Sequence, residues 1–161
     1  MCDYCDCRSH PQIAALSADH ETILHLLVRL RRAVERDDSD GARMLLSPLG
    51  ELVDRHTRRE ESGVFTQLRR ADLDVAYVDR FERDQDRLHR LLEGCAGPRW
   101  RQSAELLVRS LGEHIAREES DAFPAAHQLL RPDQWDAVDA ADATTQPQED
   151  PDDRHTRAES R

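Results

Sequence analysis

The chain has 161 residues, which is enough for one domain with a hydrophobic core and too few for two domains of ordinary size. Apolar residues make up 38% of the chain, aromatic residues 4% and charged residues 35%, a composition that favours amphipathic helices over strands. With 33 acidic against 23 basic residues the net charge is −10, which argues against nucleic acid and anionic membranes as partners.

The first residues do not have the pattern of a targeting segment. No apolar run approaches the ~20 residues of a membrane span, and the N-terminus lacks the hydrophobic stretch of a signal peptide. We therefore expect a cytoplasmic protein. In that reducing compartment the four cysteines, Cys2, Cys5, Cys7 and Cys95, are expected to be thiols or metal ligands rather than disulfides.

Apolar residues at alternating steps of three and four predict four amphipathic helices of bundle length. A Cys-rich leader over residues 1–10 precedes them, and the polar stretch 37–41 separates the first helix from the second. Pro48 either kinks the second helix or marks its true start, because proline fits best in the first turn of a helix. The four helices are expected at about residues 11–36, 42–70, 74–93 and 99–130.

The segment after the fourth helix has two parts. A short C-terminal helix is expected around Trp135 and Val138, whose apolar side chains can pack against the bundle, so we place the bundle domain at residues 11–140. Residues 141–161 are polar, acidic and contain proline, which predicts a disordered tail.

Each predicted helix carries one histidine on its apolar stripe: His20, His56, His89 and His114. A single histidine in that position is usually a core residue with satisfied hydrogen bonds. Four of them are harder to explain in this way, because each buried imidazole needs partners that a leucine-rich core cannot supply.

Two of these histidines are followed four residues later by a glutamate, in the segments HTRREE and HIAREE. Four residues are about one helical turn, so both side chains of each pair point at the same part of the bundle interior. A metal cluster would satisfy the imidazoles and the carboxylates together, since each glutamate can bridge two ions. The alternative is a pair of exposed hydrogen bonds on the charged face that the neighbouring arginines indicate.

The order His, HxxxE, His, HxxxE, with DHETI around His20, resembles the hemerythrin-like HHE cation-binding family over about residues 12–130. This resemblance implies an all-α, up-down-up-down four-helix bundle that holds two iron ions. One histidine from each of the first two helices serves one ion, one from each of the last two serves the other, and two glutamates bridge them with an oxo or hydroxo group. The implied ligands are His20, His56, Glu60, His89, His114 and Glu118.

The third helix departs from the oxygen-carrying hemerythrins that the chain resembles, which have a further histidine one turn before the ligand of that helix. Gln85 occupies this place, and a neutral amide is a poor iron ligand. Gln85 and Asp86 are therefore expected to line the site, and the second ion keeps a further open position unless Asp86 fills it. More open positions favour reaction over reversible storage.

Other charged and imidazole side chains receive lesser roles. Glu61 and Glu119 follow the two bridging glutamates directly and are expected to be outer partners of the ligands or solvated charges. His25, His127 and His155 lie off the stripe or in terminal segments, and we expect them at the surface.

The leader offers a candidate second site. Cys2, Cys5, Cys7 and His10 are the ligand types of a tetrahedral zinc or iron site. Redox-active thiols that pass electrons to the diiron centre or protect it are an alternative. A frayed terminus is the third interpretation, because ten residues without a scaffold organise a site poorly.

The pattern leaves three functions open. The first is a diiron enzyme that reacts with hydrogen peroxide or O2, most simply by catalase-like decomposition of peroxide. The second is a module that binds or senses O2, nitric oxide or iron without turnover. The third is a structural bundle with zinc or no metal. Small molecules are the expected partners, and the chain is either a monomer or a small homo-oligomer.

Overall fold

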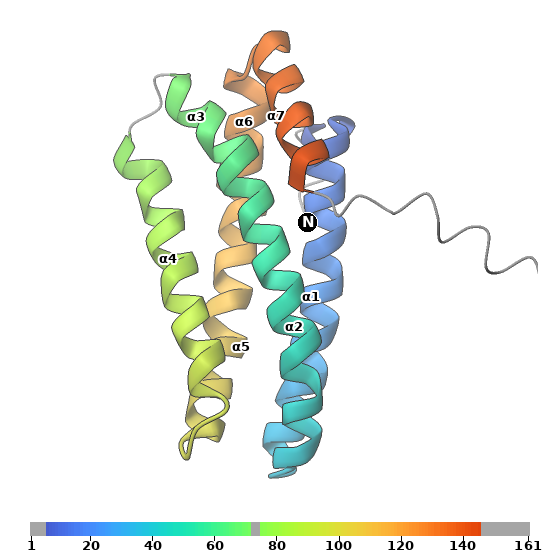
Figure 1. Cartoon of the computed structure of the whole chain (residues 1–161), viewed down its shortest axis with the longest axis vertical. Helices are drawn as coiled ribbons and strands as arrows, with labels where there is room; N and C mark the ends of the chain where they lie inside the picture. The colour runs from blue at the N-terminus through green and yellow to red at the C-terminus, as the bar shows by residue number, and fades with distance from the viewer. Residues whose placement is uncertain (1–5, 72–74, 146–161) are drawn as a thin grey trace, which may run out of the picture.

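The computed structural model describes residues 6–71 and 75–145, and within these residues the chain is all-α. Four long helical segments, alternately up and down, lie side by side, as expected (Figure 1). None of the described helices is both long enough and apolar enough to cross a bilayer. The helices are α1 Pro11–Glu35, α2 Ser39–Glu60, α3 Thr66–Arg70, α4 Val75–Gly94, α5 Trp100–Arg117, α6 Phe123–Leu129 and α7 Pro132–Thr145.

The connection between α1 and α2 is short and capped. Asp37 has a positive φ of 55°, and Asp38 accepts a hydrogen bond of 2.8 Å from the backbone N–H of Gly41. This cap fixes the start of α2 at Ser39. Pro48 therefore lies inside α2 and does not mark its beginning.

Two of the four long segments each consist of two helices joined by a π-helical turn. Residues Glu61–Phe65 join α2 to α3, and residues Glu118–Ala122 join α5 to α6. A π turn inserts an extra residue into a helical turn, and such turns are frequent at functional positions. Each of these turns lies at the glutamate that ends an HxxxE motif.

Apolar side chains form two separate core clusters along the bundle. One lies toward the connections between α1 and α2 and between α4 and α5, and it includes Leu30 and Leu107. The other lies toward the opposite end and includes Phe65, Phe81 and Phe123. All five side chains are fully buried.

A layer of buried polar side chains separates the two clusters. On α1, for example, His20 lies between Leu16 of one cluster and Ile23 of the other. The same alternation occurs on the other three long segments, and the polar side chains are no more than 3% exposed. This polar layer consists of His20, His56, Glu60, Gln85, His114 and Glu118.

Helix α7 covers the end of the bundle that holds the second cluster. Trp135 and Val138 belong to that cluster, and Val138 packs on Gly63, where an added Cβ would lie 3.3 Å from Val138 Cγ1. The helix continues to Thr145, so residues 141–145, which the sequence assigned to the disordered tail, are helical. The tail residues 146–161 lie outside the described residues.

Candidate metal centre

Four side chains of the polar layer converge on one point. His20 of α1, His56 and Glu60 of α2, and Glu118 at the start of the second π turn each offer one ligand atom, and these atoms lie within 4.8 Å of one another. Imidazole nitrogens and carboxylate oxygens are ligands for iron, manganese and zinc. The structure thus brings together four of the six side chains that the sequence pattern implied.

His114 of α5 adjoins this group through Glu118. Its Nε2 lies 2.7 Å from Oε1 of Glu118, but the two atoms do not have the geometry of a hydrogen bond. On the other side of the group, Nε2 of His20 and Nε2 of His56 face each other at 2.9 Å. These nitrogen and oxygen atoms therefore lie close together although not all of them form hydrogen bonds with one another.

Several atoms of the polar layer lack a hydrogen-bond partner among the described residues. They include both carboxylate oxygens of Glu118, Oε1 of Glu60 and Nε2 of His114. A buried polar atom left in this state costs about 1–3 kcal/mol. A cation between these atoms would satisfy all of them, so the side chains fit a metal.

The charges of the layer shift the pKa values of its members in opposite directions. Burial and the charge of Glu118 raise the pKa of Glu60. Burial would raise the pKa of Glu118 as well, but the nearby His114 and His20 outweigh it and lower this pKa. Burial alone would lower the pKa of His56, whereas Glu60 and Asp19 raise it to about 10. Without a metal the layer therefore retains protons, and a metal must displace them to bind.

The two glutamates lie in copies of one ten-residue motif. Residues 56–65 read HTRREESGVF and residues 114–123 read HIAREESDAF, with His, Arg, both Glu, Ser and Phe in common. In each copy the π turn lies between the first glutamate and the phenylalanine, and Phe65 and Phe123 are both fully buried. The sequence pattern was interpreted only as HxxxEE, and its extension to the phenylalanine was the available signal for these turns.

Gln85 of α4 reaches the polar layer, as the sequence predicted. Its side-chain N–H donates a hydrogen bond of 2.8 Å to Oε2 of Glu60, and the residue is 1% exposed. Helix α4 therefore contributes an amide to the layer, whereas the imidazole implied as its ligand, His89, lies outside the layer. This amide holds one oxygen of Glu60.

The structure does not bring His89 or Asp86 into the group. The side chain of His89 is 37% exposed, with Nε2 2.8 Å from Asp54 Oδ1 and Nδ1 2.9 Å from the backbone oxygen of Gln85. Leu88 is buried on α4 in the place expected for His89. The prediction that His89 lies on the buried face of this helix is therefore wrong. Asp86 is exposed.

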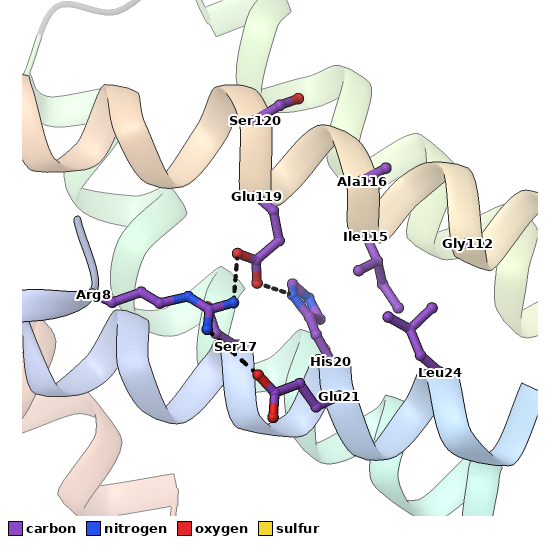
Figure 2. A pocket seen from close by; sticks show the side chains of 10 residues that line it. All are labelled: Arg8, Ser17, His20, Glu21, Leu24, Gly112, Ile115, Ala116, Glu119 and Ser120. Atoms are coloured by element: carbon purple, nitrogen blue, oxygen red, sulfur yellow. Dashed lines mark hydrogen bonds and ion pairs between the residues drawn. The ribbon is translucent and has the colours of Figure 1, made fainter. Parts of the chain in front are cut away.

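Glu119 contacts the outer nitrogen of His20. Its Oε1 lies 2.9 Å from His20 Nδ1, and its Oε2 accepts a hydrogen bond of 3.1 Å from Arg8, as Figure 2 shows. Burial would raise the pKa of Glu119, but His20 and Arg8 outweigh it and lower this pKa to about 2. The sequence gave Glu119 two alternatives, an outer partner or a solvated charge, and it is buried beside His20. It gave no indication of Arg8, which lies in the 3₁₀ turn Cys7–Ser9.

A second carboxylate faces the outer nitrogen of His56. Asp19 Oδ2 lies 3.8 Å from His56 Nδ1 and 2.9 Å from a guanidinium nitrogen of Arg59, which also donates a hydrogen bond to Asp142 of α7. The sequence did not indicate these three outer residues. Asp142 in particular lies 83 positions from Arg59, and only the packing of α7 on α2 brings the two together.

Two residues of the candidate cysteine site are described. Cys7 is 1% exposed and belongs to the second apolar cluster. The ring of His10 stacks on Trp135, with centroids 3.8 Å apart, and meets His127 edge to face at 5.2 Å. Cys2 and Cys5 lie outside the described residues, so the cysteine site stays a prediction.

A helical bundle with buried histidines and glutamates at its centre defines a metal-binding protein of the bundle class. The model of the hemerythrin HHE cation-binding domain family matches residues 12–126. The chain therefore belongs to this family, and the resemblance noted in the sequence is confirmed. Comparisons with curated proteins and with solved structures gave no match.

Proposed function

We propose that the chain is a non-haem diiron protein that reacts with hydrogen peroxide or O2, most simply by decomposing peroxide as a catalase does. The observation that carries this proposal is the polar layer, in which Oε1 of Glu60 and both carboxylate oxygens of Glu118 lack hydrogen-bond partners among the described residues. Gln85 adds to it, because α4 offers an amide where an oxygen carrier would have a further imidazole. In the net reaction one peroxide is reduced to two waters while a second is oxidised to O2.

The residues of the polar layer divide the binding of the ions between them. His20 and His56 would hold one ion, His114 would hold the other, and Glu60 and Glu118 would supply carboxylate oxygens to both; the proximity of four of these side chains and the contact of His114 with Glu118 support this assignment. When bound, two irons supply the electrons for a two-electron reduction of peroxide or O2. Gln85 supplies no strong ligand to the second ion, and His89 would have to leave Asp54 before reaching it.

The two apolar clusters keep bulk water away from the layer. Phe123 stacks on His20 with a centroid distance of 5.5 Å, and Phe81 lies 6.1 Å from the ring of His114. Exclusion of water strengthens the electrostatic interactions of the carboxylates and protects a reactive centre from side reactions. It also limits the substrate to small molecules.

A cavity of about 480 Å³ lies between α1 and α5 and reaches His20 (Figure 2). Leu24 and Ile115 form apolar walls, and Gly112 leaves space because it has no side chain. Arg8 and Glu119 occupy one end of the cavity as an ion pair. Uncharged molecules of the size of O2, hydrogen peroxide or nitric oxide fit such a space better than charged ones.

The deciding experiment is anaerobic loading with iron(II), followed by metal analysis, an absorbance spectrum and oxygen-electrode measurements after addition of peroxide. Sustained O2 evolution supports the proposal, and stoichiometric bleaching without turnover contradicts it. A reversible spectral change on cycling O2 or nitric oxide, with no product, indicates the alternative of a binding or sensing module. A spectrum without iron bands after aerobic loading indicates a structural bundle with zinc or no metal.

Zinc or iron at Cys2, Cys5, Cys7 and His10 is a separate proposal that the same metal analysis tests. Cys7 packs in the second cluster and His10 stacks on Trp135. A Cys2→Ser, Cys5→Ser double variant leaves the packing of Cys7 intact. Loss of one ion per chain in this variant supports the site, and unchanged metal content contradicts it.

A further inference from the structure

Two histidines of the polar layer each have a carboxylate at the outer nitrogen and an arginine behind that carboxylate. His20 is followed outward by Glu119 and then Arg8. For His56 the order is Asp19 and then Arg59. Because the Nε2 atoms of both histidines face the centre, the outer contacts are made by the Nδ1 atoms. The proposed ligands therefore have ordered surroundings on the side away from the metal.

The contacts around His20 are the tighter of the two sets. Nδ1 of His20 and Oε1 of Glu119 are 2.9 Å apart, and the side chain of Glu119 is 12% exposed. Arg8 bridges Glu119 and Glu21 across the end of the cavity, at 3.1 Å and 3.4 Å (Figure 2). Glu21 is not part of the surroundings of His20. Its side chain is 51% exposed and contacts Nη1 of Arg8, whereas Glu119 contacts Nη2.

The contacts around His56 are longer, and the arginine among them is more deeply buried than Arg8. Asp19 lies 3.8 Å from His56, beyond hydrogen-bond distance, and the same oxygen of Asp19 accepts a 2.9 Å bond from Arg59. The side chain of Arg59 is only 10% exposed and bonds Asp142 of α7 on its other side. Arg59 thus lies between two carboxylates from different helices.

A carboxylate at the outer nitrogen of a histidine ligand has two effects. It accepts the Nδ1–H, which fixes the tautomer and leaves the Nε2 lone pair free for a metal. It also makes the imidazole a stronger electron donor, which favours the higher oxidation state of a bound iron. A guanidinium on that carboxylate weakens its pull on the Nδ1–H and opposes the second effect.

We propose that Glu119 is a positioning residue for His20, that Asp19 acts on His56 through its charge at a longer distance, and that Arg8 and Arg59 moderate the electron donation of these histidines. This inference rests on the proposed function, since it assigns outer partners to the same centre. Arg8 comes from the leader, and Arg59 is held by Asp142 of α7. Segments on both sides of the four long helices therefore act on the centre.

The sequence provides a matched control for Glu119 in Glu61. Both residues follow the first glutamate of the ten-residue motif, and both precede a serine. Glu61 is exposed, however, whereas Glu119 is buried against His20. Glu119→Gln and Glu61→Gln therefore remove the same charge from the same motif position, and only the first removes the contact with a ligand.

The first measurement is zinc affinity of the full chain by chelator competition, because zinc has no redox chemistry of its own. We expect Glu119→Gln to weaken zinc binding about 10- to 100-fold, the usual effect of losing such an outer partner. Glu61→Gln should leave the affinity unchanged. Asp19→Asn should weaken it less than Glu119→Gln, because the contact of Asp19 with His56 is longer. Circular dichroism of the metal-free variants verifies that the helices are retained.

The second measurement is the reduction potential of the iron-loaded protein. Glu119→Gln should raise the potential, whereas Arg8→Gln should lower it by freeing the carboxylate to pull harder on His20. Arg59→Gln should also lower the potential. Arg55→Gln is the control for it, because Arg55 is 47% exposed and its contact with the same aspartate is long, at 4.0 Å. If these residues only maintained the local structure, the glutamate and the arginine variants should shift the reduction potential in the same direction.

The outcomes separate this inference from the proposed function. Wild-type protein that binds neither zinc nor iron overturns both. Wild-type protein that binds metal, with Glu119→Gln indistinguishable from Glu61→Gln in affinity, overturns the positioning role and leaves the diiron proposal intact. Potentials that shift in the same direction in Glu119→Gln and Arg8→Gln overturn the moderating role of the arginines.

Discussion

The side-chain amide of Gln85 donates a hydrogen bond of 2.8 Å to Oε2 of Glu60, and both residues are buried. This bond joins α4 to α2 inside the polar layer. It also directs an amide N–H, which cannot bind a cation, toward one of the two proposed bridging carboxylates. The identity of residue 85 therefore determines how many protein ligands the second ion of the proposed diiron centre could have.

Gln85→His should convert the centre from turnover toward reversible binding. An imidazole at this position can bind a metal, so it should fill a ligand position and slow peroxide decomposition by roughly tenfold. Oxygen-electrode rates, normalised to iron content, provide the measurement. Gln67→His is the control, since Gln67 is also buried but lies on α3 outside the layer. Equal rates in wild type and Gln85→His would contradict the role assigned to this position.

His114 and His89 should differ in their effect on metal content. The resemblance to the hemerythrin-like family implied both as ligands of one ion, whereas the structure brings only His114 into contact with Glu118. We expect His114→Ala to lower the metal content, by about half if two ions bind. His89→Ala should retain the metal, because it removes only a half-exposed contact with Asp54. Metal analysis after gel filtration measures both, and loss of metal in His89→Ala would restore His89 as a ligand.

The fold was predictable because the apolar pattern of each helix is long and regular. The stripe of α1 through Ile13, Leu16, His20 and Ile23 is buried at every one of these positions. The HxxxE spacing likewise placed His56 and Glu60 on one face, since a helix fixes the relation of residues four apart. Local periodicity was thus sufficient for four helices and for most of the polar layer.

Features that depend on packing between elements were not predictable in the same way. Helix α4, the third helix of the sequence prediction, has Leu88 and His89 in consecutive positions. A step of three residues from Gln85 reaches Leu88 and a step of four reaches His89, so the apolar periodicity alone could not decide which of them is buried. Arg8 and Glu119 are 111 positions apart, and no local pattern connects them. The end of α7 at Thr145 was missed because its last residues, ADATT, include no large apolar side chain that would mark a buried face.

Metal should stabilise the folded chain because the polar layer exists only when the four helices are assembled. A metal present at a hundredfold excess over its dissociation constant adds about 2.7 kcal/mol to the free energy of unfolding. For a chain of this size we expect the unfolding temperature to rise by about 5–11 °C. Differential scanning calorimetry with and without zinc measures this shift, and a chelator should reverse it. Glu118→Ala should abolish the shift, and a shift of equal size in that variant would place the metal elsewhere.

The stability of the metal-free protein should fall as the pH rises above about 6.5. The pKa of His56 is raised from 6.5 to about 10 in the folded state, so its stabilising contribution is complete below pH 6.5 and is lost as the pH approaches 10. The raised pKa of Glu60 acts in the same direction. Glu119 has its pKa lowered from 4.5 to about 2, and its contribution is lost as the pH falls through that range.

Unfolding temperatures of the metal-free protein between pH 3 and pH 10 test this dependence. His56→Gln should flatten the alkaline limb and leave the acid limb in place, whereas Glu119→Gln should flatten the acid limb. A stability that increases from pH 6.5 to pH 9 in the metal-free protein would show that the polar layer does not retain its protons.

Blocking the cavity between α1 and α5 should slow the reaction with peroxide without changing the bound metal. Gly112 lines this cavity, and neither Gly112 nor Gly50 of α2 has an atom within 4 Å of an added Cβ, so both accept a side chain without a clash at that atom. Gly112→Leu and Gly50→Leu should each gain about 1 kcal/mol of helix stability, because leucine is the better helix former. Only Gly112→Leu places its side chain in the cavity that His20 lines. Stopped-flow spectra of the iron-loaded variants should show a slower reaction in Gly112→Leu alone, and equal rates in both variants would exclude this cavity as the route to the centre.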